Sequence, residues 1–300
     1  MPRIQFDKPA LSIKQHIELL RERGLAITDE ALAREYLRYV GYYRLSGYML
    51  PFQKGGQGED RHRFVNTPSF HDIVDLYTFD RKLRLLLLDA IERIEIALRA
   101  ALSTVLAVDH GPHWYLDPTH FDPRYDHGDF LERAKKDIGH NEPRRRDLFM
   151  AHYYDHYSNP PMPPSWMLFE ALSFGPVSMA IKGLEKGNRK RIAREFSIPE
   201  PAMKSWPHCL SYIRNLCAHH SRLWNRTFTI RPFAPREFAD DFADQGRIYA
   251  QLAVAQIFMK KISPMSQWSD RLQALLDEYP AITPARLHFP NRWQQRAVWR

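Results

Sequence analysis

Apolar residues recur with a helical period over most of the chain, and one segment shows this most clearly. From residue 69 to residue 108 an apolar side chain returns every three or four positions, which is the spacing of one face of an α-helix. The members of this row include Ile73, Leu76, Leu83, Leu87, Ile91, Ile94 and Leu98. Ser69, with Asp72 three residues later, resembles the capping box that begins many helices. The pattern therefore predicts one long helix that ends near Val108.

Shorter amphipathic segments precede and follow this helix. They are predicted at residues 12–23, 28–39, 128–138, 144–157, 166–172, 177–185, 188–196, 201–219, 244–262 and 266–278. Pro207 is expected to kink the helix at 201–219 or to delay its start. Segment 227–231 is predicted to be extended. The fold class that follows is all-α, a multi-helix bundle with additional helices and irregular connectors.

The domain organisation depends on one proline-rich connector. Residues 158–164 contain four prolines and form the best candidate for an internal boundary. The helix at 201–219 is expected to need the long helix that precedes this connector. We therefore predict a single domain over 1–300, with 1–66 as an N-terminal helical extension and 67–280 as the core.

The charge balance narrows the class of partner. The chain has 43 Lys and Arg residues against 35 Asp and Glu residues, a net charge of +8. This excess favours a polyanion, either a nucleic acid or an anionic membrane. No apolar run is long enough to span a bilayer, and the first residues lack the apolar core of a signal peptide. Cys209 and Cys217 lie about 12 Å apart along one helix, too far for a disulfide. We expect a soluble cytoplasmic protein with no membrane partner.

Residues 212–226 concentrate acid–base and phosphate-binding side chains. The stretch contains Arg214, Asn215, His219, His220, Arg222, Trp224, Asn225 and Arg226. Histidine both accepts and gives a proton near neutral pH, and arginine presents a fork of donors that matches a phosphate. This combination indicates chemistry on a phosphodiester. The alternative is an ordinary helix end, where the helix dipole favours cations in the last turn, and the residues alone leave both open.

Helical geometry limits how these side chains can meet. Asn215 and His219 are four positions apart and share a helix face. Arg214 and His219 are five apart, about 140° around an ideal helix. They meet only if the arginine wraps around the helix, if the helix ends nearby, or if a second copy of the chain faces the first.

Several segments resemble known families. Arg214-Asn215-x-x-x-His219 resembles the Arg-x4–6-His motif of HEPN-type ribonucleases. The longer string at 214–225 is similar to the Abi-like family of bacterial phage-defence proteins, the abortive-infection proteins of the AbiD/AbiF type. Segments 42–48, 79–84, 91–95 and 172–175 fit the same family in the same order. The resemblance thus extends over most of the chain.

The resemblance implies a HEPN-like helical bundle and a metal-independent endoribonuclease that acts as a toxin or abortive-infection effector. His219 would be the general base or acid, and Arg214 would bind the scissile phosphate. Asn215 and His220 would support them. HEPN proteins commonly form their site between two chains, so a homodimer is implied. The RNA substrate would be joined by a small-RNA or protein antitoxin as a further partner.

Glu95 is a further supporting candidate, on the long helix. It falls on an apolar row, seven residues from both Leu88 and Leu102, and a carboxylate there needs a partner. Two interpretations remain open: an ion pair with Arg99 one turn later, or a role in orienting an active-site arginine.

Cations on both sides of the motif are candidate RNA contacts. They are Arg222 and Arg226 after it, and Arg189, Lys190, Arg191 and Arg194 before it. A non-catalytic RNA-binding or RNA-sensing module, or a helical interaction scaffold, would use the same residues differently. No cofactor and no metal site are expected, since the spacing of His208, Cys209, Cys217 and His219 matches no usual zinc pattern.

Overall fold

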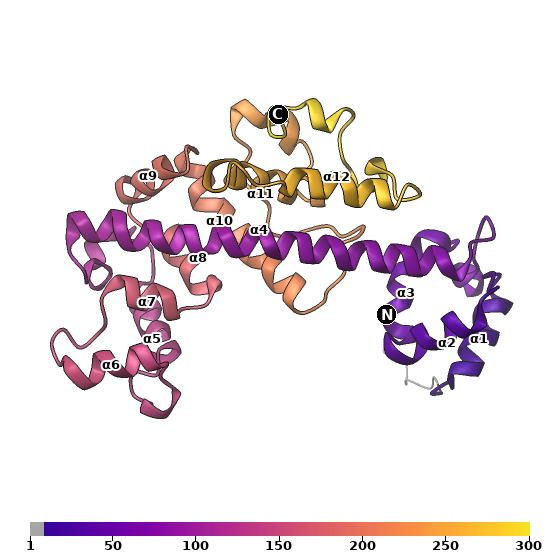
Figure 1. Cartoon of the computed structure of the whole chain (residues 1–300), viewed down its shortest axis with the longest axis horizontal. Coiled ribbons are helices and arrows are strands. Elements are labelled where there is room, and N and C mark those ends of the chain that lie inside the picture. Colours follow the sequence, from indigo (N-terminus) through magenta and orange to yellow (C-terminus); the bar gives the residue numbers. More distant parts are fainter. Residues whose placement is uncertain (1–8) are drawn as a thin grey trace. The chain divides into compact units, whose positions relative to one another are not determined.

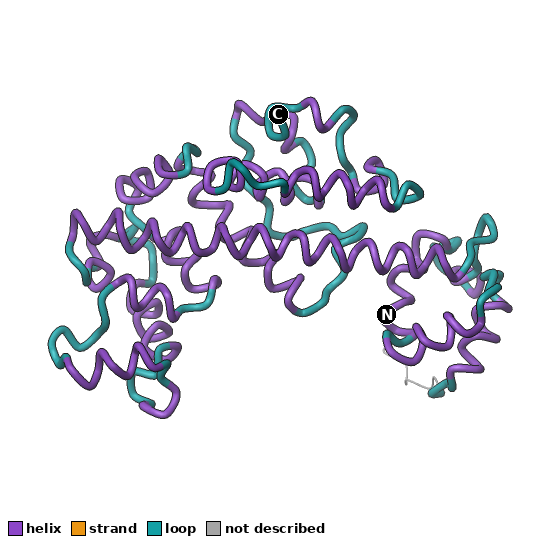
Figure 2. The backbone as a smooth tube through the Cα atoms, viewed as in Figure 1, coloured by secondary structure: helices purple, strands orange, loops and turns teal. Residues whose placement is uncertain are grey.

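The computed structural model describes residues 9–300, and their backbone forms helices with no sheet, apart from isolated bridges. Figure 2 shows this helical backbone, with loops between the helices. The prediction of an all-α fold is confirmed. The chain divides into two compact units, 1–82 and 83–300, and the division falls inside one long helix, α4 (Phe70–His110).

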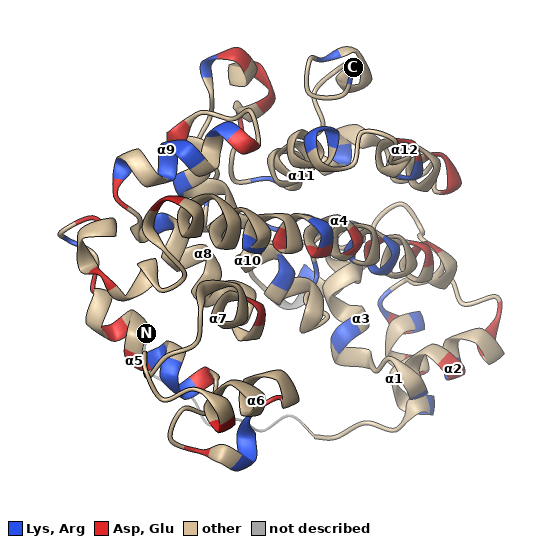
Figure 3. Ribbon diagram, turned by 60° about the vertical axis from the view of Figure 1, so that its left-hand side comes forward, with Lys and Arg blue, Asp and Glu red and all other residues tan. Residues whose placement is uncertain are grey.

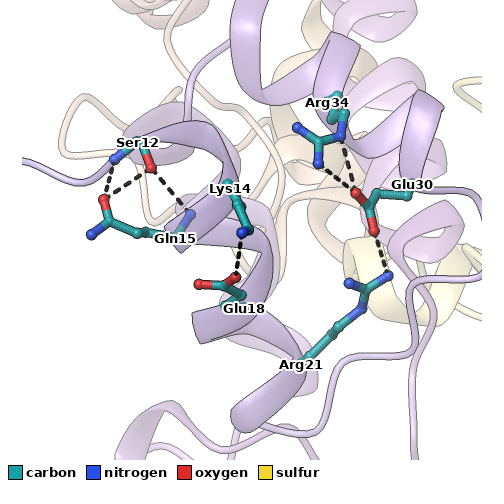
Figure 4. A network of polar contacts seen from close by, with 7 residues as sticks. All are labelled: Ser12, Lys14, Gln15, Glu18, Arg21, Glu30 and Arg34. Carbon is teal, nitrogen blue, oxygen red and sulfur yellow. Dashed lines mark hydrogen bonds and ion pairs between the residues drawn. The ribbon is translucent and has the colours of Figure 1, made fainter.

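The first unit contains α1 (Ile13–Glu22), α2 (Glu30–Tyr39), α3 (Tyr42–Met49) and the beginning of α4. Ser12 caps α1 through a capping box with Gln15, because an N-terminal turn leaves backbone N–H groups without helical partners. Glu30 lies between Arg21 (2.9 Å) and Arg34 (2.6 Å) and links the end of α1 to the start of α2 (Figure 4). Inside this unit, the hydroxyl of buried Tyr48 donates to the carboxylate of buried Asp80 at 2.7 Å.

The second unit contains the rest of α4 and all later helices (Figure 1). These are α5 (His127–Asp137), α6 (Leu148–His156), α7 (Ser165–Ala171), α8 (Phe174–Gly183), α9 (Lys186–Glu195), α10 (Glu200–Ala218), α11 (Ile248–Ile262) and α12 (Trp268–Glu278). α12 is joined to α4 because the buried indole of Trp268 donates to the carbonyl of Leu86 at 2.8 Å.

α10 is the central element of the second unit, because it packs against α8, α9 and α11. Its buried side chains include Met203, Trp206, Leu210 and Ile213. The ring of Trp206 stacks on Phe242 at 5.8 Å between centroids. The helix begins at Glu200 and continues through buried Pro207, so its start is not delayed as expected. The side chains buried next to this proline, Trp206, Cys209 and Leu210, supply packing energy that its poor helix propensity does not outweigh.

The proline-rich connector at 158–164 lies within the second unit and is bonded to it. The hydroxyl of Tyr153 donates to the carbonyls of Pro160 (2.8 Å) and Met162 (2.9 Å), and that of Tyr115 donates to the carbonyl of Pro163 (2.5 Å). The predicted division into one domain with an N-terminal extension stays a prediction. Cys209 and Cys217 are both free and buried. Burial raises the pKa of Cys209 to about 12.

Candidate active site

The motif lies where α10 ends, and backbone hydrogen bonds define that end. The N–H of His219 bonds to the carbonyl of Asn215 (3.0 Å), and the N–H of His220 bonds to that of Cys217 (3.0 Å). The N–H of Ser221 reaches back to the carbonyl of Leu216 (2.8 Å). This is the Schellman pattern, which places the residue after the C-cap in the left-handed region. His220 occupies that position with φ 55°, so its backbone has a structural role in stopping the helix.

Arg214 and Asn215 are directly connected. The Nη1 atom of Arg214 donates to Oδ1 of Asn215 at 3.2 Å. His219 follows as the C-cap and is exposed. The helix therefore ends beside the motif, which is one of the conditions under which the arginine and the histidine can meet. Within residues 9–300 of one chain, however, no hydrogen bond joins the side chains of Arg214 and His219.

On one side, Arg214 faces a cavity of about 530 Å³ rich in carboxylates. The cavity is lined by the acidic residues Asp89, Glu92, Glu95 and Glu170, and by Arg99 and Arg214 as its two guanidinium groups. Asp89 pairs with Arg93 and Arg271, and Glu95 pairs with Arg99, which leaves Glu92 and Glu170 beside Arg214. These two carboxylates would repel a phosphate that enters this cavity. A phosphate would approach Arg214 more favourably from the side of Asn215.

Glu95 forms an ion pair with Arg99, one turn later on α4. Both side chains are mostly buried, at 14% and 13% exposed respectively. Arg99 also donates to the carbonyls of Phe169 and of Glu170 (2.7 Å), at the end of α7. The pair thus fixes α7 to α4, because the cation satisfies carbonyls that a helix end leaves without partners. Whether Glu95 also orients Arg214 across the shared cavity stays a prediction.

Arg189 is a structural residue, which corrects its assignment as an RNA contact. It is 3% exposed, forms an ion pair with Glu200, and donates to the carbonyls of Lys182 (3.1 Å) and Leu184 at the end of α8. A linear run of cations does not reveal such partners. Figure 3 shows Lys and Arg along α9 in blue. Among these residues, Arg189 is buried.

The other predicted RNA contacts differ in their accessibility. Lys190 and Arg194 are exposed on α9, whereas Arg191 forms an ion pair with Asp109 of α4. Arg222 and Arg226, after the motif, are half-buried. The Nη1 atom of Arg226 is buried without a hydrogen-bond partner in the described part of the chain. These positions stay candidates, with Lys190 and Arg194 the most available to a ligand.

Trp224 and Asn225 shape the turn that follows the motif. Trp224 is 2% exposed, as predicted, and the guanidinium of Arg286 lies 5.7 Å from its ring centroid. Asn225 has φ 48°, a left-handed conformation that asparagine tolerates. The N–H of Arg226 closes the turn on the carbonyl of Leu223 at 3.2 Å.

A basic cavity of about 900 Å³ lies beside the first half of α10, and the sequence pattern did not indicate it. The cations of this cavity come from several separate segments, so no sequence motif predicts the cavity. The signal that was available is the spacing on α10 itself, where Lys204, His208 and Asn215 fall on one helix face.

Comparison with known proteins identifies the family. A family model described as Abi-like protein matches residues 35–225, more than half of the chain. The chain belongs to the Abi-like family. The match includes Glu95, Arg214 and His219, and ends before Arg226 and before α11. The comparisons with curated proteins and with solved structures found no match.

Two further observations concern metal ions and membranes. Within residues 9–300, no group of three or more His, Cys, Asp or Glu side chains is arranged to hold a metal ion. No helix in the same range combines the length and the apolar composition that a membrane crossing requires.

Proposed function

We propose that this Abi-like protein is a metal-independent endoribonuclease of the HEPN type that acts as an abortive-infection effector in phage defence. The observation that supports it most is the arrangement at the end of α10. An exposed histidine, His219, follows directly after the helix, and an arginine and an asparagine that bond to each other lie one turn earlier.

The proposed reaction is a transesterification within the RNA strand. His219 takes the proton from a ribose 2′-hydroxyl, whose oxygen attacks the adjacent phosphorus, and a protonated histidine gives a proton to the 5′-oxygen as the P–O5′ bond breaks. Arg214 stabilises the charge that develops on the phosphoryl oxygens. The products are a 2′,3′-cyclic phosphate and a 5′-hydroxyl, and the balance needs no co-reactant.

A homodimer is part of the proposal, since no hydrogen bond joins Arg214 to His219 within residues 9–300 of one chain. A two-fold axis near the end of α10 would bring two such sets together. Sedimentation at micromolar concentration should show a dimer. A fully active monomer would remove the composite site from the proposal.

The decisive experiment incubates purified protein with RNA in the presence of EDTA. The His219→Ala variant should lose cleavage by about 10²-fold or more, and Arg214→Ala should lose it as well. His220→Asn, at the neighbouring supporting histidine, should lose less cleavage than His219→Ala; asparagine is chosen because it tolerates the left-handed backbone at this position. Equal cleavage and equal growth inhibition by wild type and His219→Ala, at equal expression, would refute the assignment.

A second candidate is a non-catalytic RNA-binding or RNA-sensing module, and the basic cavity along α10 favours it independently of the motif. In that case the wild-type protein binds RNA without cleaving it, and His219→Ala changes nothing. The same EDTA experiment, read on intact RNA, separates the two functions.

A further inference from the structure

One face of α10 lines two cavities in succession. Pro201, Lys204 and His208 line the basic cavity of about 900 Å³. His208, Ser211, Tyr212 and Asn215 line a second cavity of about 580 Å³. These positions recur every three or four residues and so share one side of the helix. From residue 201 to residue 215 the helix rises about 21 Å.

The two cavities are adjacent, because Arg124, His208 and Ile230 line both. Together they form a groove along α10, which we call the α10 groove. All of its lining residues belong to the second unit. Asn215 stands at its far end, and His219 lies one helical turn beyond Asn215.

The first half of the α10 groove has an excess of positive charge. Its two carboxylates already have partners: Asp122 bonds to Arg124 at 3.0 Å, and Glu200 bonds to Arg189. The guanidinium of Arg124 holds the pKa of Asp122 well below its usual range, so this carboxylate stays ionised and paired.

Four cations of the groove form no ion pair within 4 Å among the described residues, although Lys204 also acts electrostatically on Asp122: Lys182, Lys186, Lys204 and Arg231. Cations brought together in a cavity without neutralising carboxylates repel one another, and a bound anion relieves that repulsion. The arrangement therefore fits several negative charges in a row.

The walls of the groove are held in place by hydrogen bonds. The N–H of Phe233 donates to the hydroxyl of Ser205, and the indole of Trp206 donates to the carbonyl of Phe233, both at 2.9 Å. These bonds fix the segment that carries Arg231. Arg189 binds the carbonyls of Lys182 and Leu184 and so fixes the segment that carries Lys182.

The second half of the groove offers apolar surface. Its lining includes Tyr125, Phe130, Pro176, Met179, Tyr212 and Ile230. Its charged residues are balanced, since Asp129 pairs with Arg133 at 2.8 Å and Asp126 caps α5. Aromatic and apolar side chains beside a basic track are the surface on which unpaired bases stack.

We propose that the α10 groove holds single-stranded RNA and leads it to the motif. Phosphates lie against Lys182, Lys204 and Arg231, and unpaired bases lie on the apolar half toward Asn215. A free phosphate would use only the basic half, and a duplex would hide the bases that the apolar half accepts. This inference rests on the proposed function for its substrate and gives that substrate a path.

The test measures binding of a fluorescein-labelled single-stranded RNA to His219→Ala protein, so that the RNA survives. A groove variant adds Lys182→Gln, Lys204→Gln and Arg231→Gln. A control variant instead adds Arg38→Gln, Lys136→Gln and Lys261→Gln, which removes the same charge from exposed positions elsewhere. Thermal melting of both verifies that they fold.

The groove variant should bind at least tenfold more weakly than the control variant. The slope of log K against log salt should flatten by about 2, since each phosphate contact on a single strand contributes about 0.7. A duplex of the same sequence should bind less tightly, and millimolar inorganic phosphate should not displace the RNA.

The outcomes separate this inference from the proposed function. Equal binding by the groove and control variants would overturn the groove while the wild-type protein still cleaves RNA. Binding that depends on the groove, without cleavage by wild type, would support the groove and refute the nuclease. Preference for a duplex, or displacement by phosphate, would overturn the assignment to single-stranded RNA.

Discussion

Replacing Arg189 by alanine should destabilise the protein strongly, although the residue belongs to a cationic helix that looks like a solvated surface. Its guanidinium holds three acceptors together: the carboxylate of Glu200 and the carbonyls of Lys182 and Leu184. The side chain of Arg189 is 4% exposed and that of Glu200 is 11% exposed, so water cannot replace the lost donors without a local opening.

The magnitude follows from what the truncation leaves behind. Removing one partner of a buried ion pair leaves the other charge uncompensated, at about 3–5 kcal/mol. The orphaned carbonyls add to this cost only in part, because contributions within one network are not additive. We expect a loss of about 3–5 kcal/mol in the free energy of unfolding, within the range of the whole stability of many domains.

Urea unfolding followed by circular dichroism measures this loss. Arg194→Ala is the matched control, since Arg194 is exposed on the same helix, and it should change the free energy by no more than about 0.5 kcal/mol. A double-mutant cycle with Glu200→Ala should show a coupling energy above about 1 kcal/mol. If Arg189→Ala costs no more than Arg194→Ala, the ion pair contributes nothing and Arg189 returns to the set of possible RNA contacts.

Three other predictions test the fold around α10 and the motif. Gly183→Ala should destabilise the protein by about 1–3 kcal/mol, because a Cβ at Gly183 would lie 2.5 Å from the ring of Tyr125. Urea unfolding measures this loss, and an unchanged midpoint would mean that the ring is free to move. His220→Gly should be more stable than His220→Ala by about 1 kcal/mol, since both lose the imidazole and only glycine accepts φ 55° without strain; equal stability would show that the helix ends differently. Burial lowers the pKa of His113 and of His208 below 6.5, so the unfolded chain binds protons more readily than the folded one. The free energy of unfolding should therefore fall as the pH falls through and below 6.5. A free energy of unfolding at pH 5.5 equal to or above that at pH 7.5 would contradict this.

The helices that the sequence predicts best have both a regular row of apolar residues and a capping residue at their start. α4 was predicted from its apolar row and from Ser69 with Asp72, and both bonds of that capping box are present, at 2.7 Å and 3.3 Å. α1 likewise begins after Ser12 and ends before Gly24, whose φ is 91°. Local chemistry decides such boundaries, so a single sequence contains the information.

Boundaries that depend on tertiary context were predicted less well. α8 begins at Phe174 rather than at Val177, since Gly175 and Pro176 fall in its first turn, where a missing N–H removes no helical bond. α9 is capped by Glu185, whose carboxylate accepts from the N–H groups of Gly187 and Asn188, and not by Asn188 itself. In both cases the residue that was expected to break or cap the helix lies inside its first turn.

The roles of charged residues were the least predictable feature. Arg189 and Arg194 look equivalent in the sequence, but one meets Glu200 from α10 and the other meets solvent. Lys182 and Arg231 show the opposite relation. They lie 49 positions apart and share no sequence motif, yet they line the same cavity. A charge acquires its role from its partners in space, and those partners come from segments that only the fold brings together.

The positions of the two cavities around α10 bear directly on how a phosphate would reach the motif. Arg214 lines the cavity rich in carboxylates, whereas Asn215, the next residue, lines the α10 groove. A hydrogen bond of 3.2 Å joins the side chains of these two consecutive residues. On the proposed function, a phosphate that moves along the groove meets Asn215 first, and its oxygen can replace Oδ1 of Asn215 as the acceptor for Nη1 of Arg214. The carboxylates of the other cavity attract the guanidinium of Arg214 and hold it near them. Arg214 therefore binds the phosphate by exchanging one acceptor for another, and it does not move around the helix to His219. This is the physical reason why a histidine contributed by a second copy of the chain is part of the proposed site.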